Sequence, residues 1–403
     1  MVVAYFLPEI GSGAHIYYDL AKGFVRRGHE VHIITSYPRE YNLHKKDKGK
    51  KYLLDEIIDG INVHRCKNIL INRDIIFLRG LEHFTLPYIY FKRFKRLKIN
   101  FDVCLIYIPP LPLYYFGEKI KKKFKIPYVL NFQDFHPDEL TDVGVLKNKI
   151  VISILRHIEK KAYLNPDYIT TISPRGIKLI KERSKRKNNL TCIYNSIDLN
   201  LVNKLKKIKN FKKKEKIEDK FLITYAGILS PFQGIDDILD VAKMLKNHKE
   251  IIFYIVGDGM AKEHLMERKK KEKIDNLKIL PLQPRKEYFN IVNSSDINIV
   301  SLDRRMKAPC LPGKLQNLLA LGKTIIANVP QENDIAKILK EFKCGLVITP
   351  GNPKEFKNAI LKLKKDKKLR EIFSKNGEKF VRENMNLEKN IKKYEEIFER
   401  IKL

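Results

Sequence analysis

One short segment combines proline, glycine and lysine in an order that suits the binding of a diphosphate. Leu311-Pro312-Gly313-Lys314 comes directly before a helical pattern over 315–321. Proline and glycine at a helix start leave backbone N–H groups free at the positive end of the helix, and Lys314 adds a full charge beside them. We expect Lys314 and the amides of 313–315 to stabilise a leaving diphosphate. A solvated lysine in a first helical turn is the plainer alternative.

Two glycine-bounded loops follow apolar runs in the same half of the chain. Gly227 to Gly234, which includes Gln233, comes after the strand-like run 221–226, and Gly257-Asp258-Gly259 comes after 251–256. Glycine lets a ligand approach the backbone closely, because it has no Cβ. These loops are therefore candidates for donor binding, although glycines that serve only a tight turn would give the same pattern.

A similar loop, Gly11-Ser12-Gly13, opens the first half and is followed by His15. It joins a strand-like run to a helical pattern, so its amides can face an anion or a sugar. A dinucleotide site would need a third glycine where Ile16 stands and an acidic residue where Thr35 to Tyr37 close the next strand. The sequence therefore disfavours NAD and favours a sugar or acceptor site.

The segment 131–139 is dense in side chains that hydrogen-bond hydroxyl groups. It contains Asp134 and His136, either of which could orient or deprotonate an acceptor hydroxyl. A structural role is the plainer alternative, because a single Asp or His in a loop more often has one. Asp296-Ile297-Asn298 resembles a metal-binding pair but lies at a strand start, so we expect no metal ion and no cofactor.

The elements that position these residues alternate between strand and helix patterns. Apolar runs recur at 2–6, 31–35, 61–65, 102–107, 127–131, 168–172 and 190–193, and again from 221 to 349, with helical spacing between them. The pattern predicts an α/β protein with two doubly wound parallel-sheet domains facing across a cleft. We expect domains over 1–200 and 221–384, a basic linker over 201–220, and a final helix over 385–403. That helix is a candidate for packing back on the first domain.

The chain has 403 residues and a formal net charge of +33. Such a charge suits nucleic acid, an anionic membrane or phosphorylated substrates, and a general lysine bias would also produce it. No nucleic-acid motif is present, so we expect no specific nucleic acid. Residues 75–98 mix aromatic and basic groups at helical spacing, which suits either an anionic membrane surface or a core helix with a solvated basic face. Five scattered cysteines and no apolar span favour a reducing cytoplasm, with contact at the inner face of the membrane.

Taken in order along the chain, these motifs resemble a retaining family 4 glycosyltransferase of the GT-B fold. The subgroup that is most similar transfers N-acetyl-fucosamine and related amino sugars in surface polysaccharide synthesis. The segments that carry the resemblance are 5–35, 133–138, 173–174, 194–198, 226–227, 233–234, 256–259 and 311–314.

The resemblance implies an enzyme that moves a hexose, an amino- or deoxy-hexose, from a nucleotide sugar to a glycan or lipid-linked acceptor with retention. The second domain would bind the donor and the first the acceptor. The donor residues implied are Gly227, Gln233, Gly257, Asp258, Gly259, Leu282, Pro312, Gly313, Lys314 and Asn317. The acceptor side would comprise Gly11, Ser12, Gly13, His15, Asp134 and His136.

Some positions depart from the family pattern. Where many members carry Arg and Lys after the first strand of the second domain, this chain has Ile228 and Gln233. The family's paired acids fall at Pro309 and Asn317, and the amide of Asn317 is a weak substitute for a ribose-binding carboxylate. These departures leave open a non-catalytic nucleotide-sugar protein, or an epimerase without an acceptor.

Overall fold

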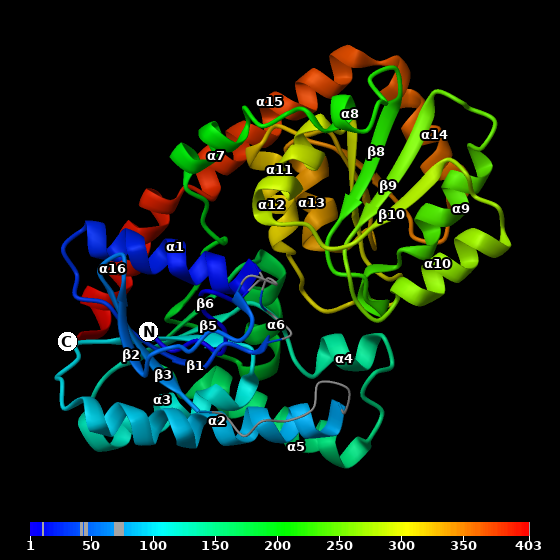
Figure 1. Ribbon diagram of the computed structural model, residues 1–403. Helices are drawn as coiled ribbons and strands as arrows, with labels where there is room; N and C mark the ends of the chain where they lie inside the picture. Colours follow the sequence, from blue (N-terminus) through cyan, green and yellow to red (C-terminus); the bar gives the residue numbers. More distant parts are fainter. Residues whose placement is uncertain (10–11, 41–42, 44–46, 68–75, 403) are drawn as a thin grey trace. The chain divides into compact units, whose positions relative to one another are not determined.

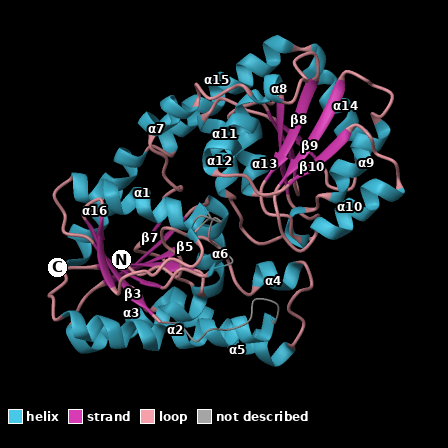
Figure 2. Cartoon of the chain, viewed as in Figure 1, coloured by secondary structure: helices cyan, strands magenta, loops and turns pink. Residues whose placement is uncertain are grey.

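The alternation of apolar runs and helical patterns gives two units, each built on a largely parallel sheet. The computed structural model describes residues 1–402 except 10–11, 41–42, 44–46 and 68–75, with backbone alone for 12 and 76–81. The first unit comprises 1–141, 146–196 and 387–403, and the second comprises 142–145 and 197–386. Figures 1 and 2 show the helices and strands of the two units.

The sheet of the first unit is organised around the start of the chain. Val2 forms a parallel bridge with Ile34 on one side and with Ile106 on the other, so it joins two sets of strands. One set has the order β1-β3-β2 and the other the order β4-β5-β6-β7, and only β2 runs antiparallel to its neighbour. The strands are β1 (His32–Ser36), β2 (Asp55–Ile58), β3 (Ile61–Cys66), β4 (Cys104–Ile108), β5 (Tyr128–Phe132), β6 (Tyr168–Thr171) and β7 (Leu190–Cys192). The run predicted over 2–6 is therefore a single bridge, and β2 was not predicted.

Helices cover both faces of this sheet because successive strand residues point to opposite sides. Val3, Ile33 and Leu105 pack on α1 (Ser12–Arg26) and α16 (Leu387–Lys402). Their neighbours Val2, Ile34 and Ile106 pack on the other layer, which is below the sheet in Figure 1. That layer contains α2 (Ile76–Leu97), η3 (Leu111–Leu113), α3 (Tyr114–Phe124), α5 (Lys149–Leu164) and α6 (Pro174–Ser184), and the short α4 (Asp138–Asp142) precedes α5.

The last helix belongs to the first unit. Gly23 on α1 approaches α16 so closely that an added Cβ would lie 2.2 Å from Ile391 Cδ1. Arg27 donates to Glu395 at 2.6 Å across the same contact. Of the segment predicted over 385–403, the helix α16 thus packs on α1, near the start of the chain.

The second unit carries a six-stranded, wholly parallel sheet of order β10-β9-β8-β11-β12-β13. Its strands are β8 (Phe221–Ala226), β9 (Ile251–Val256), β10 (Leu277–Leu280), β11 (Ile297–Ser301), β12 (Ile325–Asn328) and β13 (Leu346–Ile348). The helices are α9 (Asp236–Met244), α10 (Lys262–Lys271), α11 (Arg285–Ser294), α12 (Gly313–Ala320), α13 (Asp334–Glu341), α14 (Pro353–Lys365) and α15 (Lys367–Asn384), with the 3-10 turn η4 (Pro231–Gln233) after β8.

The basic segment 201–220, expected to be a connector with little core of its own, instead carries structure of the second unit. It contains most of α7 (Leu199–Leu205) and all of α8 (Phe211–Lys214). Phe211 is buried, and its ring meets Tyr254 of β9 at a centroid distance of 5.2 Å. Lys213 and Lys214 of α8 are exposed, whereas Lys212 pairs with Asp296 and Phe211 anchors the helix. The sequence pattern concealed that anchor.

Strand order reverses next to the central strand of each unit. In the second unit the chain moves outward from β8 to β9 and β10, then returns to β11 on the other side of β8. In the first unit the corresponding reversal lies at Val2, between β1 and β4. Parallel α/β sheets bind ligands at the carboxyl ends of the strands beside such a switch point. Among the described helices, none is both long and apolar enough to cross a membrane.

Candidate active site

Three loops are hydrogen-bonded to one another at the carboxyl edge of the second sheet. The amide of Gly227 donates to Val256 O at 2.9 Å, and that of Gly257 donates to Leu280 O at 3.0 Å. These bonds continue the ladder past the ends of β8, β9 and β10. Backbone hydrogen bonds therefore tie these loops together at the edge where parallel sheets bind ligands.

The glycines of this edge are required by the crossing of the backbones themselves. A Cβ at Gly257 would lie 1.9 Å from Gly227 O, and one at Gly259 would lie 2.3 Å from Leu229 O. Gly259 also has φ +146°, a conformation that other residues rarely adopt. The absence of a Cβ at Gly257 and Gly259 thus allows the loop after β8 to approach closely.

Lys314 lies at the switch point of this sheet, between the loops that follow β8 and β11. Its Nζ donates to Gln233 Oε1 at 2.6 Å and to Tyr225 Oη at 3.0 Å. The same ammonium sits 4.1 Å from the centre of the Tyr225 ring, close enough for a cation–π contact. A Cβ on Gly227 would be 3.5 Å from Nζ, so the lysine also faces the backbone of the β8 loop. The structure therefore brings Gly227, Gln233 and Lys314 together.

Burial lowers the pKa of Lys314 to about 7, and only Cys310 opposes the shift. None of the described side chains forms a salt bridge with its ammonium group. Gln233 and Tyr225 supply neutral oxygens, which orient the ammonium group without neutralising it. An anion that reached this point would meet a positive charge whose position is already set.

The helix that follows Lys314 adds backbone donors. Pro312 precedes α12 and supplies no side-chain cap. Leu315 N–H donates to Pro312 O at 3.0 Å. Of the three amides expected to bind a diphosphate, only those of Gly313 and Lys314 have no acceptor among the described residues. Together with Nζ they form a small cluster of donors at a helix N-terminus.

Three other predicted donor residues differ in their contacts and exposure. Asn317 hydrogen-bonds the buried hydroxyl of Tyr288, whose pKa burial raises to about 12. Asp258 Oδ1 accepts the N–H of Gly259 at 2.8 Å, and Oδ2 lies 3.3 Å from Lys262, so its carboxylate is turned to its own loop. Leu282, in the loop after β10, is about half exposed. Two of these residues therefore have structural partners already.

In the first unit, Asp134 follows β5 at the carboxyl edge of the sheet. None of the described residues donates a side-chain hydrogen bond to its carboxylate, and burial raises its pKa to about 6. The carboxylate is near enough to Tyr107 and Tyr17 to raise their phenol pKa values further above the ordinary range. Gly13 completes the group, because a Cβ there would lie 3.2 Å from Tyr107 Oη. Gly13 and Asp134 thus come together around Tyr107.

The remaining predicted acceptor residues are less defined. His136 is largely buried, which lowers its pKa to about 4, and its Nε2 lies 3.7 Å from a Glu139 carboxylate oxygen. His15 is partly exposed on α1. Gly11 lies outside the described residues, and for Ser12 only the backbone is described.

Beside this group lies a buried amide network that sequence reasoning missed. Gln133 and Asn195 exchange two hydrogen bonds of 2.7 and 2.8 Å, and Gln133 also donates to Asn131. Asn131 in turn donates to Thr170 on β6 and to Tyr394 on α16. The network fixes the backbone just before Asp134. The one sequence signal for this network was the presence of polar residues such as Asn131 and Thr170 within otherwise apolar strands.

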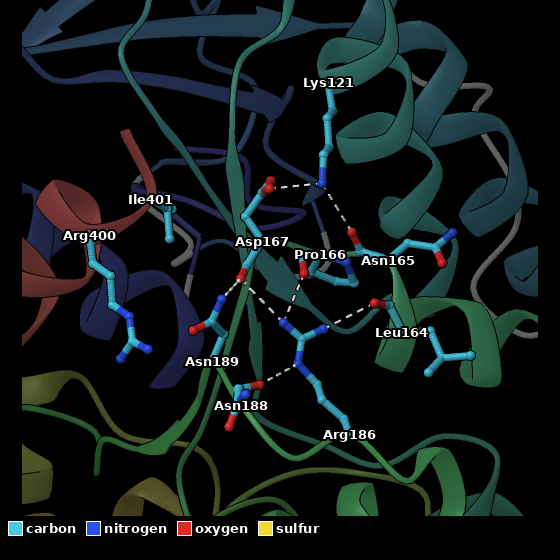
Figure 3. A pocket seen from close by; sticks show the side chains of 10 residues that line it. All are labelled: Lys121, Leu164, Asn165, Pro166, Asp167, Arg186, Asn188, Asn189, Arg400 and Ile401. Atoms are coloured by element: carbon cyan, nitrogen blue, oxygen red, sulfur yellow. Dashed lines mark hydrogen bonds and ion pairs between the residues drawn. The ribbon is translucent and has the colours of Figure 1, made fainter. Parts of the chain in front are cut away.

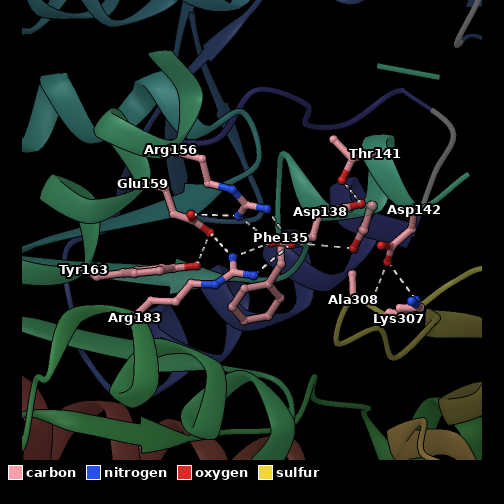
Figure 4. Close-up of polar contacts among 11 residues, drawn as sticks. Phe135, Asp138, Thr141, Asp142, Arg156, Glu159, Tyr163, Arg183, Lys307 and Ala308 are labelled. Atoms are coloured by element: carbon pink, nitrogen blue, oxygen red, sulfur yellow. Dashed lines mark hydrogen bonds and ion pairs between the residues drawn. The ribbon is translucent and has the colours of Figure 1, made fainter. Parts of the chain in front are cut away.

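Asp138 has a structural role that Figure 4 makes clear. Its two carboxylate oxygens accept from Arg156 and from Arg183, with Arg156 at 2.7 and 2.8 Å. Burial opposes ionisation, but the hydrogen bonds from both guanidinium groups lower the pKa of Asp138 to about 2. Glu159 completes the ion cluster from α5. The cluster anchors the loop that carries Asp134 and His136.

A hollow of about 520 Å³ lies at the opposite, amino edge of the same sheet (Figure 3). Asp167 and Asn189, which directly precede β6 and β7, line it. The guanidinium of Arg186 donates to five main-chain carbonyls there, so its hydrogen-bonding capacity is used to hold loops. This hollow is therefore remote from the carboxyl-edge residues.

Comparison with known proteins assigns the chain to a class. Residues 11–201 match the family model described as Glycosyltransferase Family 4, and 206–380 match Glycosyl transferases group 1. The chain is a GT-B glycosyltransferase. It is 26% identical to an uncharacterized glycosyltransferase (MJ1069) of Methanocaldococcus jannaschii, over 80% of this chain and 82% of that protein. It is 21% identical to the putative colanic acid biosynthesis glycosyl transferase WcaI of Escherichia coli, over 83% and 84%.

Among solved structures, Anabaena HepE in complex with UDP-glucose superposes with a TM-score of 0.72 at 14% identity, covering 99% of both chains. The predicted α/β fold with two Rossmann-like parallel-sheet domains is confirmed, as is the class of enzyme. The amino-sugar subgroup stays a prediction. The roles of individual residues in this glycosyltransferase also stay predictions.

Proposed function

We propose that this glycosyltransferase transfers a hexose, an amino- or deoxy-hexose, from a nucleoside diphosphate to a glycan or lipid-linked acceptor with retention of configuration. The donor cluster at Lys314 is the observation that carries the proposal. Two further findings support it: the fold is shared with HepE, which was solved with UDP-glucose, and the chain resembles WcaI of colanic acid biosynthesis.

The chemistry needs fixed donors at the departing phosphate. Cleavage of the sugar–phosphate bond builds negative charge on the leaving diphosphate and positive charge on the ring. Lys314 Nζ, held by Gln233 and Tyr225, and the amides of Gly313 and Lys314 would stabilise the former. The proposal assigns this role to the chain's own groups, with no metal ion or other cofactor.

We assign the acceptor to the first unit. With a pKa near 6, Asp134 is ionised at neutral pH and has no side-chain donor among the described residues, so its oxygens can accept a hydrogen bond from the acceptor hydroxyl and orient it. His136, with a pKa near 4, is neutral at the same pH and can also accept a hydrogen bond. In a retaining transfer the hydroxyl attacks from the side of the departing diphosphate, which then takes up its proton.

A thermal-shift screen against UDP-, GDP- and other nucleotide sugars tests the donor assignment. A ligand that binds the native state at a hundred times its Kd stabilises it by about 2.7 kcal/mol. We expect one nucleotide class to raise the Tm of the wild-type enzyme and to lose that effect in Lys314→Met. Product analysis by NMR then gives the anomeric configuration, and incubation with the donor alone separates transfer from an acceptor-less reaction such as epimerisation. No shift with any nucleotide sugar would contradict the proposal.

A further inference from the structure

The outward side of the layer formed by α2, α3 and α5 differs from the rest of the first unit. Exposed large apolar side chains on the helices of this unit gather here, within the part that the structure describes. They are Phe84 and Tyr88 on α2, Tyr115 and Phe124 on α3, and Ile150, Ile154 and Leu164 on α5. The opposite layer of α1 and α16 carries no side chain of this kind among the described residues. We call these seven side chains and the lysines and arginines between them the outer face.

The three helices belong to one layer of the unit. Both α2 and α5 pack on η3, and α2 also packs along α3, and all three cover the same face of the sheet, the lower one in Figure 1. Contacts between side chains join α2 to α3 directly. Lys119 Nζ of α3 lies 4.7 Å from the centre of the Tyr88 ring and 5.5 Å from that of Phe91 on α2.

Positive charge dominates the parts of α2 and α3 that follow Glu82 and Glu118. Residues 83–98 contain five lysines and arginines, residues 119–125 contain five lysines, and neither segment contains an acidic residue. Arg93 and Lys121 are paired with acidic side chains from other elements. Lys92, Arg96 and Lys122 are exposed and have no salt-bridge partner among the described residues. In α16, by contrast, four glutamates offset five basic residues.

We infer that the outer face of α2, α3 and α5 docks on an anionic lipid bilayer. Basic side chains would neutralise the headgroups, while the aromatic and isoleucine side chains would enter the boundary with the acyl chains. Tyr88 is 67% exposed and Ile150 is 73% exposed, which leaves both free to do so. The isoleucines distinguish this surface from a nucleic-acid site, because aliphatic side chains offer no ring on which a base can stack.

The inference extends the membrane contact expected for 75–98 to two further helices, and it stands independently of the donor assignment. The basic and the apolar residues of the outer face should affect vesicle binding in two ways that can be measured separately. Each basic side chain near an anionic surface contributes about fivefold to the partition coefficient, so three give about a hundredfold. The apolar contribution does not depend on salt, because it reflects burial from water rather than charge.

Co-sedimentation of the full chain with vesicles tests the docking. At about 0.1 M salt, where the Debye length is about 10 Å, we expect binding to vesicles that contain phosphatidylglycerol and little binding to pure phosphatidylcholine. The triple variant Lys92→Ala/Arg96→Ala/Lys122→Ala should bind about a hundredfold more weakly. The matched control Lys365→Ala/Lys367→Ala/Lys368→Ala removes the same charge from exposed positions of the second unit and should bind like wild type.

The double variant Tyr88→Ser/Ile150→Ser tests insertion separately. It should retain binding at low salt but lose the fraction that survives high salt. The inference is overturned if wild type ignores anionic vesicles, if the control variant weakens as much as the triple variant, or if single-stranded RNA binds the outer face in preference to vesicles. Thermal shifts with nucleotide sugars, measured on the same proteins, report the donor site alone, so failure of one assignment is visible without the other.

Discussion

Replacing Lys314 by methionine removes a charge while keeping most of the side-chain volume. The ammonium is held by Gln233 Oε1 and Tyr225 Oη, and these two groups remain 3.2 Å apart with the tyrosine hydroxyl as donor. No described acidic side chain is left unpaired by the change. We therefore expect the variant to fold, and to be no less stable than wild type at pH 7, because the site holds the ammonium at a lowered pKa.

The stability difference has a definite dependence on pH. The pKa of Lys314 is about 7 in the native state and about 10.4 in the unfolded chain. Between these values the unfolded chain binds more protons, so wild-type stability rises with pH across the interval. The penalty for holding the ammonium is full below pH 7 and vanishes near pH 10. Methionine carries no such penalty, so its stability should lack this rise.

Catalysis should move in the opposite direction. Loss of one preorganised donor at a developing anion costs about 3 kcal/mol, a fall of more than a hundredfold in kcat. Donor affinity should also depend on pH in the wild type, since only the protonated lysine attracts a diphosphate. Above pH 7 the affinity should fall by up to tenfold per pH unit, with uptake of a proton on binding.

Isothermal titration with a nucleotide sugar between pH 6.5 and 8.5, in buffers of different ionisation enthalpy, measures both effects. Lys323→Met is the matched control. Lys323 is also buried, with its pKa lowered to about 8, but it precedes β12 at the amino edge of the same sheet and donates to Asn293 O. Donor affinity that ignores pH, or an equal loss in the control, would refute the role of Lys314.

Three further predictions follow from contacts described above. Gly257→Ala should destabilise the enzyme by more than about 2 kcal/mol and abolish the donor-induced thermal shift, because its Cβ would lie 1.9 Å from Gly227 O; wild-type Tm values would contradict this. Asp134→Asn should lower kcat/KM by about a hundredfold and remove the acidic limb of the pH profile, which in wild type falls below pH 6 as the carboxyl is protonated. Asp138→Asn should cost about 3 kcal/mol in urea unfolding at pH 7, since Arg156 and Arg183 each lose one of their two carboxylate partners. The lowered pKa of Asp138 means that this difference should shrink as pH falls from about 4 toward 2, and a constant difference would count against it.

Much of the architecture was predictable because parallel sheets leave a simple record in sequence. Strands buried on both faces read as continuous apolar runs, and the glycine loops after them mark carboxyl ends. The doubly wound arrangement, with β9 and β11 on opposite sides of β8, fits that pattern, whereas the register of the strands is visible only in the structure. What the pattern could not supply was β2, whose four residues alternate in exposure at a sheet edge. The anchoring of 201–220 through Phe211 was equally hidden, because one aromatic among lysines leaves no periodic signal.

The partners of the predicted site residues depend on contacts between distant segments, and these were not predictable. Tyr225 reads as one more strand residue in 221–226, and Tyr107 as the end of 102–107. Only the fold shows that their hydroxyls face Lys314 and Gly13. An aromatic residue with a polar tip near the carboxyl end of a strand was the available signal, and it is a weak one.

The structure also bears on the departure at position 233, where many family members carry lysine. Here Gln233 Oε1 accepts from Lys314 Nζ at 2.6 Å, so the side chain acts as a neutral acceptor that orients the remaining cation. A lysine with Nζ in the same place would put two ammonium groups within about 3 Å, and their repulsion would lower the pKa of both. The glutamine at 233 therefore fits the position that the Lys314 ammonium occupies in this chain.

Two substitutions at 233 test this coupling. Gln233→Lys should lower the affinity for the donor at neutral pH, because it lowers the pKa of Lys314. Gln233→Glu should pair with the ammonium group, raise the pKa of Lys314 and shift the pH dependence of donor binding to higher pH. A Gln233→Glu enzyme whose binding profile coincides with that of wild type would show that the two side chains are not coupled.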